Sequence, residues 1–305
     1  MIKSLRKLLS LGLLLLFAGA ASTRAQVPPG FQRIEDVIYS RKFGTALTLD
    51  VFQPDQPNGC GILFIVSGGF FSSHEGINAG FYRALLERGY TVFAVVHGSQ
   101  PKFTIPEIEQ DIHRAVRFVR HAAAKFGVNP DRLGITGASA GGHLSLTLGT
   151  QGGPGQPEAK DPVDRESSAV QAVACFFPPT DFLNYGQPGE DAVGVGVLKG
   201  FKTAFGARSD NAESRQTYGK EISPIYFIRS NLPPTLIVHG DADRLVPIQQ
   251  AESFVARARQ LNGPTAKLIV RPGKEHGWKG IEADLEIFAD WFDEHLRDIS
   301  SIKRE

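Results

Sequence analysis

Six short, nearly continuous apolar runs alternate with longer segments of helical periodicity, and this alternation constrains the fold more than any other feature of the sequence. The runs, of which "GILFIVS" is typical, lie at residues 61–67, 90–96, 132–137, 169–177, 234–240 and 266–272. Continuous apolar runs of this length indicate parallel strands that are buried on both faces. Helices are expected between and after them, at residues 75–88, 106–125, from about Ser139, 248–261 and 281–297. The alternation predicts an α/β fold built on a doubly wound, mostly parallel sheet.

Two further strands are expected before these six. Residues 33–40 and 45–54 alternate apolar and polar side chains and are separated by "RKFG", a pattern typical of a β-hairpin. The sheet is therefore expected to have eight strands. Residues 180–222 lie between two of the strands and are too many for an ordinary connection, so they are expected to form a small cap over the sheet.

The first residues have the three-part pattern of a secretory signal peptide. Lys3, Arg6 and Lys7 precede an apolar run that ends in the small-residue stretch "ASTRAQ". The run is shorter than the roughly 20 residues that a membrane span needs, which disfavours the alternative of an uncleaved anchor helix. We expect residues 1–25 to be removed, leaving residues 26–305 as a secreted or periplasmic domain without stable membrane association.

The net charge, the cysteines and the histidines indicate whether to expect nucleic-acid binding, a disulfide or a cofactor. Four basic residues and no acidic residue precede position 26, so cleavage lowers the formal net charge from +1 to −3, which argues against nucleic-acid binding. An oxidising compartment would permit a disulfide between Cys60 and Cys175, but both lie beside or within apolar runs, and we expect two free buried thiols. The histidines are scattered, without H-x-x-x-H or C-x-x-C spacing, so no metal or other cofactor is expected.

The segment "GASAG" at residues 137–141 is a G-x-S-x-G pattern centred on Ser139. Its position carries more weight than the pattern, because it falls where a predicted strand meets a predicted helix. The flanking glycines allow a tight turn that exposes the hydroxyl, and the helix N-terminus behind it favours developing negative charge. Ser139 is therefore predicted to be a nucleophile, the alternative being a serine that only caps the helix.

A serine nucleophile needs a histidine as general base and an acid that orients the histidine. The candidate bases after Ser139 are His143, His239, His276 and His295. His276 lies in the loop "PGKEHGW" just after the last strand, at the carboxyl edge where open α/β sheets place their sites. We assign the base role to His276. Asp241 and Asp243, which follow the preceding strand in "HGDADRLVP", are both candidates for the acid.

The same segment carries a resemblance to a known superfamily. "HGDADRLVP" resembles the H-G-x-x-D-x-x-V-P segment of dienelactone-hydrolase-like and prolyl-oligopeptidase-like α/β-hydrolases, and the match falls on His239, Gly240, Asp243, Val246 and Pro247. The resemblance selects Asp243 as the acid and implies a triad of Ser139, Asp243 and His276. It extends from about residue 34 to about residue 295, and the layout is most similar to exported esterases related to acetyl-xylan and feruloyl esterases.

Those esterases commonly carry an H-G-G-G-W loop after the third strand, where this chain has "VSGGFF", without the histidine and the tryptophan. Oxyanion donors are expected from the N–H groups of Gly68 and Gly69 in this loop, and from Ala140 after the nucleophile. The side chains of Phe70, Phe71 and Trp278 are expected to bind substrate. Packing of the two phenylalanines in the core is the alternative.

The resemblance implies a serine hydrolase that cleaves carboxylic esters through an acyl-enzyme. Short acyl or aromatic acyl esters, such as acetylated or feruloylated polysaccharide, are the expected substrates, and a small-molecule or carbohydrate ester is the expected partner. Two alternatives remain open, a small serine peptidase of the prolyl-oligopeptidase type and a binding module on an inactive hydrolase fold.

Overall fold

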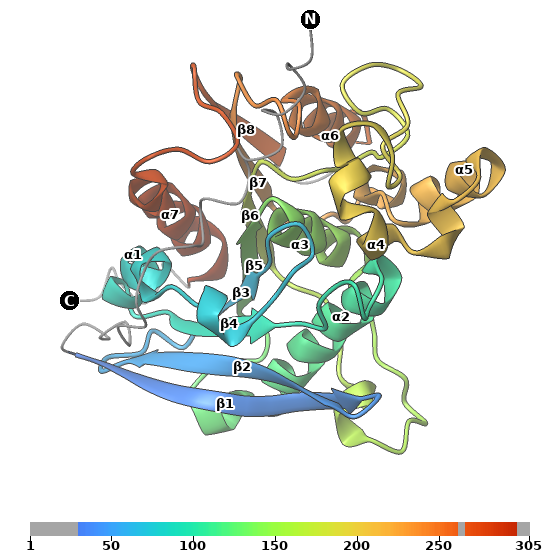
Figure 1. Cartoon of the computed structure of the whole chain (residues 1–305). Helices are drawn as coiled ribbons and strands as arrows, with labels where there is room; N and C mark the ends of the chain where they lie inside the picture. The colour runs from blue at the N-terminus through green and yellow to red at the C-terminus, as the bar shows by residue number, and fades with distance from the viewer. Residues whose placement is uncertain (1–29, 262–265, 298–305) are drawn as a thin grey trace, which may run out of the picture.

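A single sheet of eight strands forms the centre of the molecule, in the order β1-β2-β4-β3-β5-β6-β7-β8 (Figure 1). The computed structural model describes residues 30–261 and 266–297. The strands are β1 (Phe31–Lys42), β2 (Thr45–Pro54), β3 (Gly61–Val66), β4 (Thr91–Val96), β5 (Leu133–Ala138), β6 (Ala172–Phe176), β7 (Thr235–Gly240) and β8 (Ala266–Arg271). The hairpin strands β1 and β2 pair antiparallel, as do β2 and β4, and all other neighbours are parallel. The predicted doubly wound, mostly parallel sheet is confirmed.

Helices cover both faces of this sheet. They are α1 (Arg83–Glu87), α2 (Ile105–His121), α3 (Ala140–Gln151), α4 (Lys202–Phe205), α5 (Ala212–Glu221), α6 (Gln249–Gln260) and α7 (Leu285–Leu296). In Figure 1, α1 and α7 lie on one side of the sheet and α2, α3 and α6 on the other. Since both faces are covered, almost every residue of β4, β5, β6 and β7 is buried, which explains why these strands read as continuous apolar runs.

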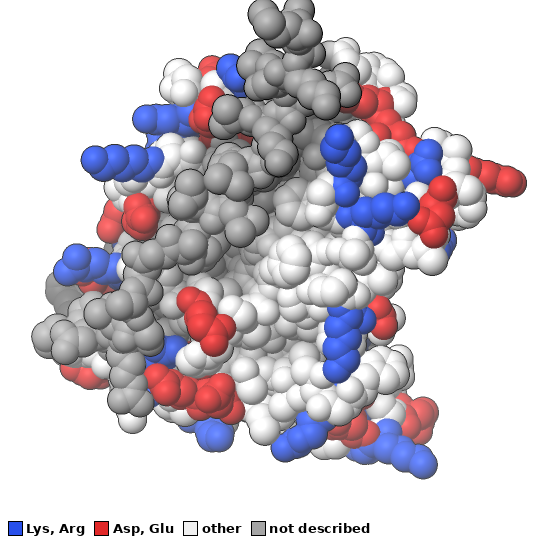
Figure 2. All heavy atoms as spheres, viewed as in Figure 1, with Lys and Arg blue, Asp and Glu red and all other residues white. Residues whose placement is uncertain are grey.

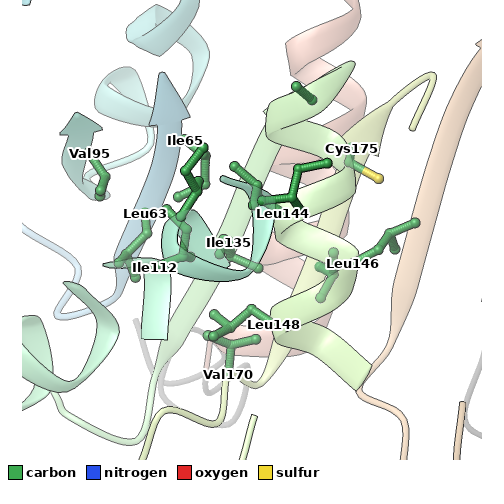
Figure 3. Packing of buried hydrophobic residues seen from close by; sticks show 14 of the residues in the cluster. Leu63, Ile65, Val95, Ile112, Ile135, Leu144, Leu146, Leu148, Val170 and Cys175 are labelled. Carbon is green, nitrogen blue, oxygen red and sulfur yellow. The ribbon is translucent and has the colours of Figure 1, made fainter. Parts of the chain in front are cut away.

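The sheet divides the apolar interior into two clusters. On the side of α2 and α3, Leu63 and Ile65 of β3 pack with Ile135 of β5 and Leu144 of α3 (Figure 3). On the side of α1 and α7, residues such as Phe292 fill the second cluster. Complete burial of one such side chain contributes about 2 to 3 kcal/mol, so the two clusters together hold the sheet and its loops in place.

The predicted helix at residues 75–88 is only partly correct. Regular α-helix is confined to Arg83–Glu87, and the preceding residues form short 3-10 turns. The Asn78 side chain accepts a hydrogen bond from the backbone N–H of Gly80 at 3.0 Å. Such a local side-chain bond competes with helix formation, and the glycines at 76 and 80 weaken the helix further. By contrast, α2 begins with a capping box between Thr104 and Glu107, close to the predicted start.

The residues predicted to form a cap, 180–222, lie between β6 and β7 and contain α4 and α5. We call residues 180–222 the insertion. Its aromatic side chains join the cluster on the side of α2 and α3, since Phe182 packs edge-on against Phe205 with ring centroids 5.3 Å apart. Phe205 also packs against Phe70 in the loop after β3, at 6.4 Å. The insertion is thus attached to the sheet edge through buried side chains.

Both cysteines are free and buried, as predicted. Cys175 belongs to the cluster beside α3 and Cys60 to the cluster beside α7. Burial raises the pKa of each thiol. The predicted signal peptide, residues 1–25, lies outside the described residues. No helix among the described residues is long and apolar enough to cross a membrane.

The junction of β5, β3 and α3 has no room for a side chain at position 141. A Cβ atom there would lie 2.7 Å from the carbonyl oxygen of Ile65. We expect Gly141→Ala to lower the free energy of unfolding by roughly 1 to 3 kcal/mol, because an atom forced into a packed interior must displace its neighbours. Urea denaturation measures this change. Gly153→Ala, where the nearest atom is 4.0 Å away, is the control. A Gly141→Ala protein as stable as the parent would contradict the packing described.

Candidate active site

The predicted nucleophile, Ser139, lies in a sharp turn between β5 and α3. Its φ of 55° and ψ of −118° fall in a region that non-glycine residues rarely adopt. The turn is held from both sides, because the Ser139 N–H donates to the carbonyl of Phe176 at 3.0 Å and the Ser139 carbonyl accepts from the His143 N–H at 2.8 Å. The flanking Gly137 is required, since a Cβ there would lie 2.6 Å from the backbone of Gly141.

The structure brings the three predicted triad residues into one hydrogen-bonded chain. The distance from His276 Nε2 to Ser139 Oγ is 2.9 Å, and that from His276 Nδ1 to Asp243 Oδ2 is 2.7 Å. Asp243 follows β7 and His276 follows β8, so the three side chains come from the carboxyl ends of parallel strands of one sheet. Residues far apart in sequence thus meet because the sheet places the ends of its strands at one edge.

Asp243 is held as a carboxylate. Its Oδ1 accepts hydrogen bonds from the N–H groups of Leu245 and Val246, both at 2.9 Å, and the Nε2 of His239 lies 3.3 Å from its Oδ2. Burial acts to raise the pKa of Asp243, but the hydrogen bonds from His239 and His276 outweigh burial and hold the pKa well below its usual value. An acid in this state keeps a proton on the facing nitrogen of His276 and so fixes the ring.

Among the described residues, no other candidate from the sequence has a side-chain hydrogen bond to Ser139 Oγ. His143 is fully buried behind the turn and donates from Nδ1 to the carbonyl of Pro179 at 3.1 Å. His295 is part of α7. Asp241, the alternative acid, accepts from the N–H of Gly273 at 2.6 Å and so joins the loops that follow β7 and β8. His239, expected to be structural, is buried and also contacts Asp243, a contact that no pattern in the sequence predicts.

The loop after β3 corrects the prediction of its oxyanion donors. Gly68 and Phe71 exchange two backbone hydrogen bonds, at 3.0 and 2.9 Å, and the two residues between them, Gly69 and Phe70, have φ of 55° and 65°. This is a tight two-residue turn. The Gly68 N–H is therefore already donated to Phe71 and is not available. The N–H groups of Gly69, Phe70 and Ala140 have no hydrogen-bond partner among the described residues.

A histidine from another strand supports this loop in place of the one missing from its sequence. His97, directly after β4, lies with Nε2 2.8 Å from the hydroxyl of Ser67. Burial lowers the pKa of His97 to about 4, so the ring is neutral near neutral pH. Its backbone N–H donates to Ser72 Oγ at 3.1 Å, and that hydroxyl donates to the Val66 carbonyl at 2.6 Å. The only signal in the sequence was a histidine at the end of an apolar run.

The three aromatic residues predicted to bind substrate differ in exposure. The prediction for Phe70 is wrong, because its side chain is only 4% exposed and packs against His143 and Phe205. The Phe70 side chain anchors the loop in the core instead of lining a substrate pocket. Phe71, in contrast, is 51% exposed. Trp278 is partly buried, and its Nε1 donates a hydrogen bond to the Asp284 carboxylate, at the end of η8 (Ile281–Asp284), at 3.0 Å.

A further aromatic side chain supports the histidine. Phe177 follows β6 with a φ of 34°, and its ring centroid lies 4.5 Å from that of His276 and 5.7 Å from that of Trp278. The view of Figure 2 shows a hollowed face whose middle is largely uncharged, with Lys, Arg, Asp and Glu gathered towards its rim.

One group of possible metal ligands occurs within residues 30–261 and 266–297, formed by Asp36, Asp50 and His74. Arg33 donates to Asp50 there, at 2.8 Å from Nε, so a side-chain cation already neutralises the buried carboxylate. None of its members belongs to the hydrogen-bonded chain of Ser139, and the group has no part in the site.

Comparison with known proteins identifies the family of this chain. Residues 49–257 match the BD-FAE family. The chain belongs to this family. A probable carboxylic ester hydrolase of Mycobacterium tuberculosis, LipM, is 28% identical over 248 residues, which is 80% of this chain and 56% of that protein. The acetylxylan esterase of Xylanibacter ruminicola is 28% identical over 253 residues, which is 80% of this chain and 44% of that protein. The BD-FAE chain spans about half the length of these relatives.

Solved structures confirm the α/β-hydrolase fold of this BD-FAE member. A truncated carbohydrate esterase from gut microbiota matches with a TM-score of 0.71 and 25% identity, over 86% of this chain and 96% of that one. An acetyl ester-xyloside bifunctional hydrolase from Caldicellulosiruptor lactoaceticus matches with a TM-score of 0.72 and 21% identity, over 85% and 95%, and supports the fold alone. The predicted resemblance to esterases of the α/β-hydrolase superfamily is confirmed.

The lowered pKa of Asp243 predicts how the stability of this BD-FAE protein depends on pH. A group whose pKa is lower in the folded state contributes stability above its unfolded pKa, about 4 for aspartate, and the contribution disappears as the pH falls towards the folded pKa. The excess stability of the parent over Asp243→Asn is therefore expected to be largest near neutral pH and to shrink below about pH 4. Urea denaturation of both proteins across this range measures it, and an excess that grows on acidification would contradict the assignment.

Proposed function

We propose that this protein is a carboxylic ester hydrolase that works through an acyl-enzyme. The observation that carries the proposal is the continuous chain from Ser139 through His276 to Asp243, with distances of 2.9 and 2.7 Å. Unpartnered backbone N–H groups lie on the two segments that meet at this serine, the loop after β3 and the start of α3. Membership of the BD-FAE family and the esterase names of the relatives support the same activity.

In the first half of the reaction, Ser139 Oγ attacks the ester carbonyl carbon and gives its proton to His276 Nε2. The carbonyl oxygen becomes an oxyanion, which the N–H groups of Gly69, Phe70 and Ala140 stabilise. Asp243 holds the imidazolium ring in place. As the tetrahedral intermediate collapses, the bond to the alcohol oxygen breaks and His276 returns the proton to that oxygen, leaving an acylated serine.

In the second half, water attacks the acyl-enzyme with His276 as base, and the acid leaves with the serine hydroxyl restored. No metal or other cofactor takes part in this scheme. The turn at Ser139 and the helix N-terminus behind it favour the same negative charge in both halves, because the oxyanion forms at one place each time.

For the substrate we propose a short acyl or aromatic acyl ester, such as an acetyl or feruloyl group on a polysaccharide. The names of an acetylxylan esterase and of a carbohydrate esterase among the relatives support this class. We also propose that residues 1–25 direct export, which suits a protein whose substrate is a polymer outside the cell.

Replacing the nucleophile tests the activity itself. We expect Ser139→Ala to lower kcat for 4-nitrophenyl acetate by at least about 10⁴-fold, because the remaining groups cannot form the acyl-enzyme. Ser167→Ala is a matched control, since this serine precedes β6 at the opposite edge of the sheet and donates to the Gly153 carbonyl. A fluorophosphonate probe should label the parent and the control but not Ser139→Ala. Turnover retained in a folded Ser139→Ala protein would refute the proposal.

A substrate panel tests the class of ester. Acetyl, butyryl and octanoyl nitrophenyl esters, methyl ferulate and a prolyl-linked peptide amide are compared by kcat/KM. We expect acetyl or feruloyl esters to exceed the amide by at least about tenfold, because the site is proposed to act on esters. A preference for the prolyl amide would instead identify a peptidase on this fold, and a preference for octanoyl esters would contradict a short acyl pocket.

A further inference from the structure

Gln100, which lies four residues beyond β4, binds the turn of the loop after β3 with both its side chain and its backbone. Gln100 is 3% exposed. Its Nε2 donates to the carbonyl of Gly69 at 2.5 Å, and its backbone N–H donates to the carbonyl of Phe70 at 3.2 Å. One residue therefore binds two successive carbonyl groups of the turn.

Holding these carbonyls aims the N–H groups on which the proposed reaction depends. In a trans peptide unit the C=O of one residue and the N–H of the next point in opposite directions. The Gly68 carbonyl is bound by the Phe71 N–H at 2.9 Å, which fixes the direction of the Gly69 N–H. The Gly69 carbonyl is bound by Gln100, which fixes the direction of the Phe70 N–H.

The insertion holds Gln100 in turn. Thr203 of α4 donates its hydroxyl hydrogen bond to Gln100 Oε1, so both ends of the amide are engaged and its orientation is defined. Phe201 of the insertion touches the same turn, since a Cβ at Gly69 would lie 2.4 Å from its ring. Phe201 thus contacts the turn directly, and Thr203 contacts it through Gln100.

We propose that Gln100 is a positioning residue that aims the Phe70 N–H at the oxyanion, and that Thr203 couples the insertion to this function. The inference rests on the proposed ester hydrolysis and names a further residue for it. Gln100 itself does not touch the substrate. Gln100 affects the stabilisation of the transition state. A misdirected N–H donor destabilises the negatively charged tetrahedral intermediate more than it destabilises the bound ester.

Two substitutions of similar size remove the hydrogen bonds. Gln100→Met keeps the length of the side chain without the amide, and Thr203→Val keeps the shape without the hydroxyl. Since loss of one oxyanion donor costs about 10²–10³-fold in kcat, we expect misdirection in Gln100→Met to lower kcat by about tenfold to a hundredfold. For Thr203→Val we expect about threefold to tenfold, because Gln100 stays but is less restrained. KM for 4-nitrophenyl acetate should change little in both.

Two further variants separate positioning from folding. Thr203→Ser retains the hydroxyl and should restore kcat to near the parent value. Thr217→Val makes the same chemical change at an exposed position of α5 in the insertion and should leave kcat unchanged. The affinity for a boronic acid, whose tetrahedral adduct with Ser139 mimics the intermediate, should fall by the same factor as kcat in each variant.

The outcomes are distinct from a failure of the proposed function. Suppose that the parent hydrolyses esters but that Gln100→Met and Thr203→Val keep kcat within twofold and at most raise KM. The positioning role is then wrong and the esterase proposal stands. If Gln100→Met does not fold, Thr203→Val and its rescue by Thr203→Ser decide the question. A parent that neither hydrolyses an ester nor is labelled at Ser139 would overturn the proposed function, and this inference with it.

Discussion

The close approach of α3 to the sheet is the constraint on which the site depends. A Cβ at Gly137 would lie 2.6 Å from Gly141, and one at Gly141 would lie 2.7 Å from the carbonyl of Ile65. Only with both glycines can the chain turn from β5 into α3 within one residue, and this places Ser139 in its unusual backbone conformation. The buried leucines of α3 press the helix against β3, β5 and β6, so packing free energy offsets the strain at the serine (Figure 3).

The order of the strands then brings the partners of Ser139 to it. β5, β6, β7 and β8 are neighbours in the sheet, and all end at the same edge. The acid and the histidine lie on loops after β7 and β8, and buried hydrogen bonds restrain both. Asp243 is bound by two backbone N–H groups and faces two histidines. The geometry of the hydrogen-bonded residues Ser139, His276 and Asp243 is therefore fixed before any substrate binds. Such preorganisation is what electrostatic stabilisation of an oxyanion requires.

The sequence was sufficient for the features that follow from local pattern. Apolar runs predicted the strands, and motifs at their ends predicted the residues that form the hydrogen-bonded chain. It was not sufficient for the loop after β3, where the sequence predicts Gly68 to be an oxyanion donor and Phe70 to be a substrate contact. Whether an N–H is free depends on hydrogen bonds across a turn, and whether a phenylalanine is buried depends on Phe205 from the insertion. Neither follows from residue types along the chain. The helix predicted at residues 75–88 is confined to Arg83–Glu87, because the Asn78 side chain competes with the longer helix that periodicity favoured.

The loop after β3 shows how a missing local residue can be replaced by distant ones. Phe70 has a φ of 65°, a conformation that costs a bulky residue about 1 to 2 kcal/mol. Three contacts compensate. The ring is buried beside His143, the carbonyl is bound by Gln100, and His97 binds Ser67 at the start of the loop. These contacts come from α3 and from the segment after β4, and Thr203 of the insertion binds Gln100 in turn, so the direction of the donors depends on how these parts pack. If Gln100 has the proposed positioning role, a change in the insertion alters the chemistry at Ser139 without touching the substrate.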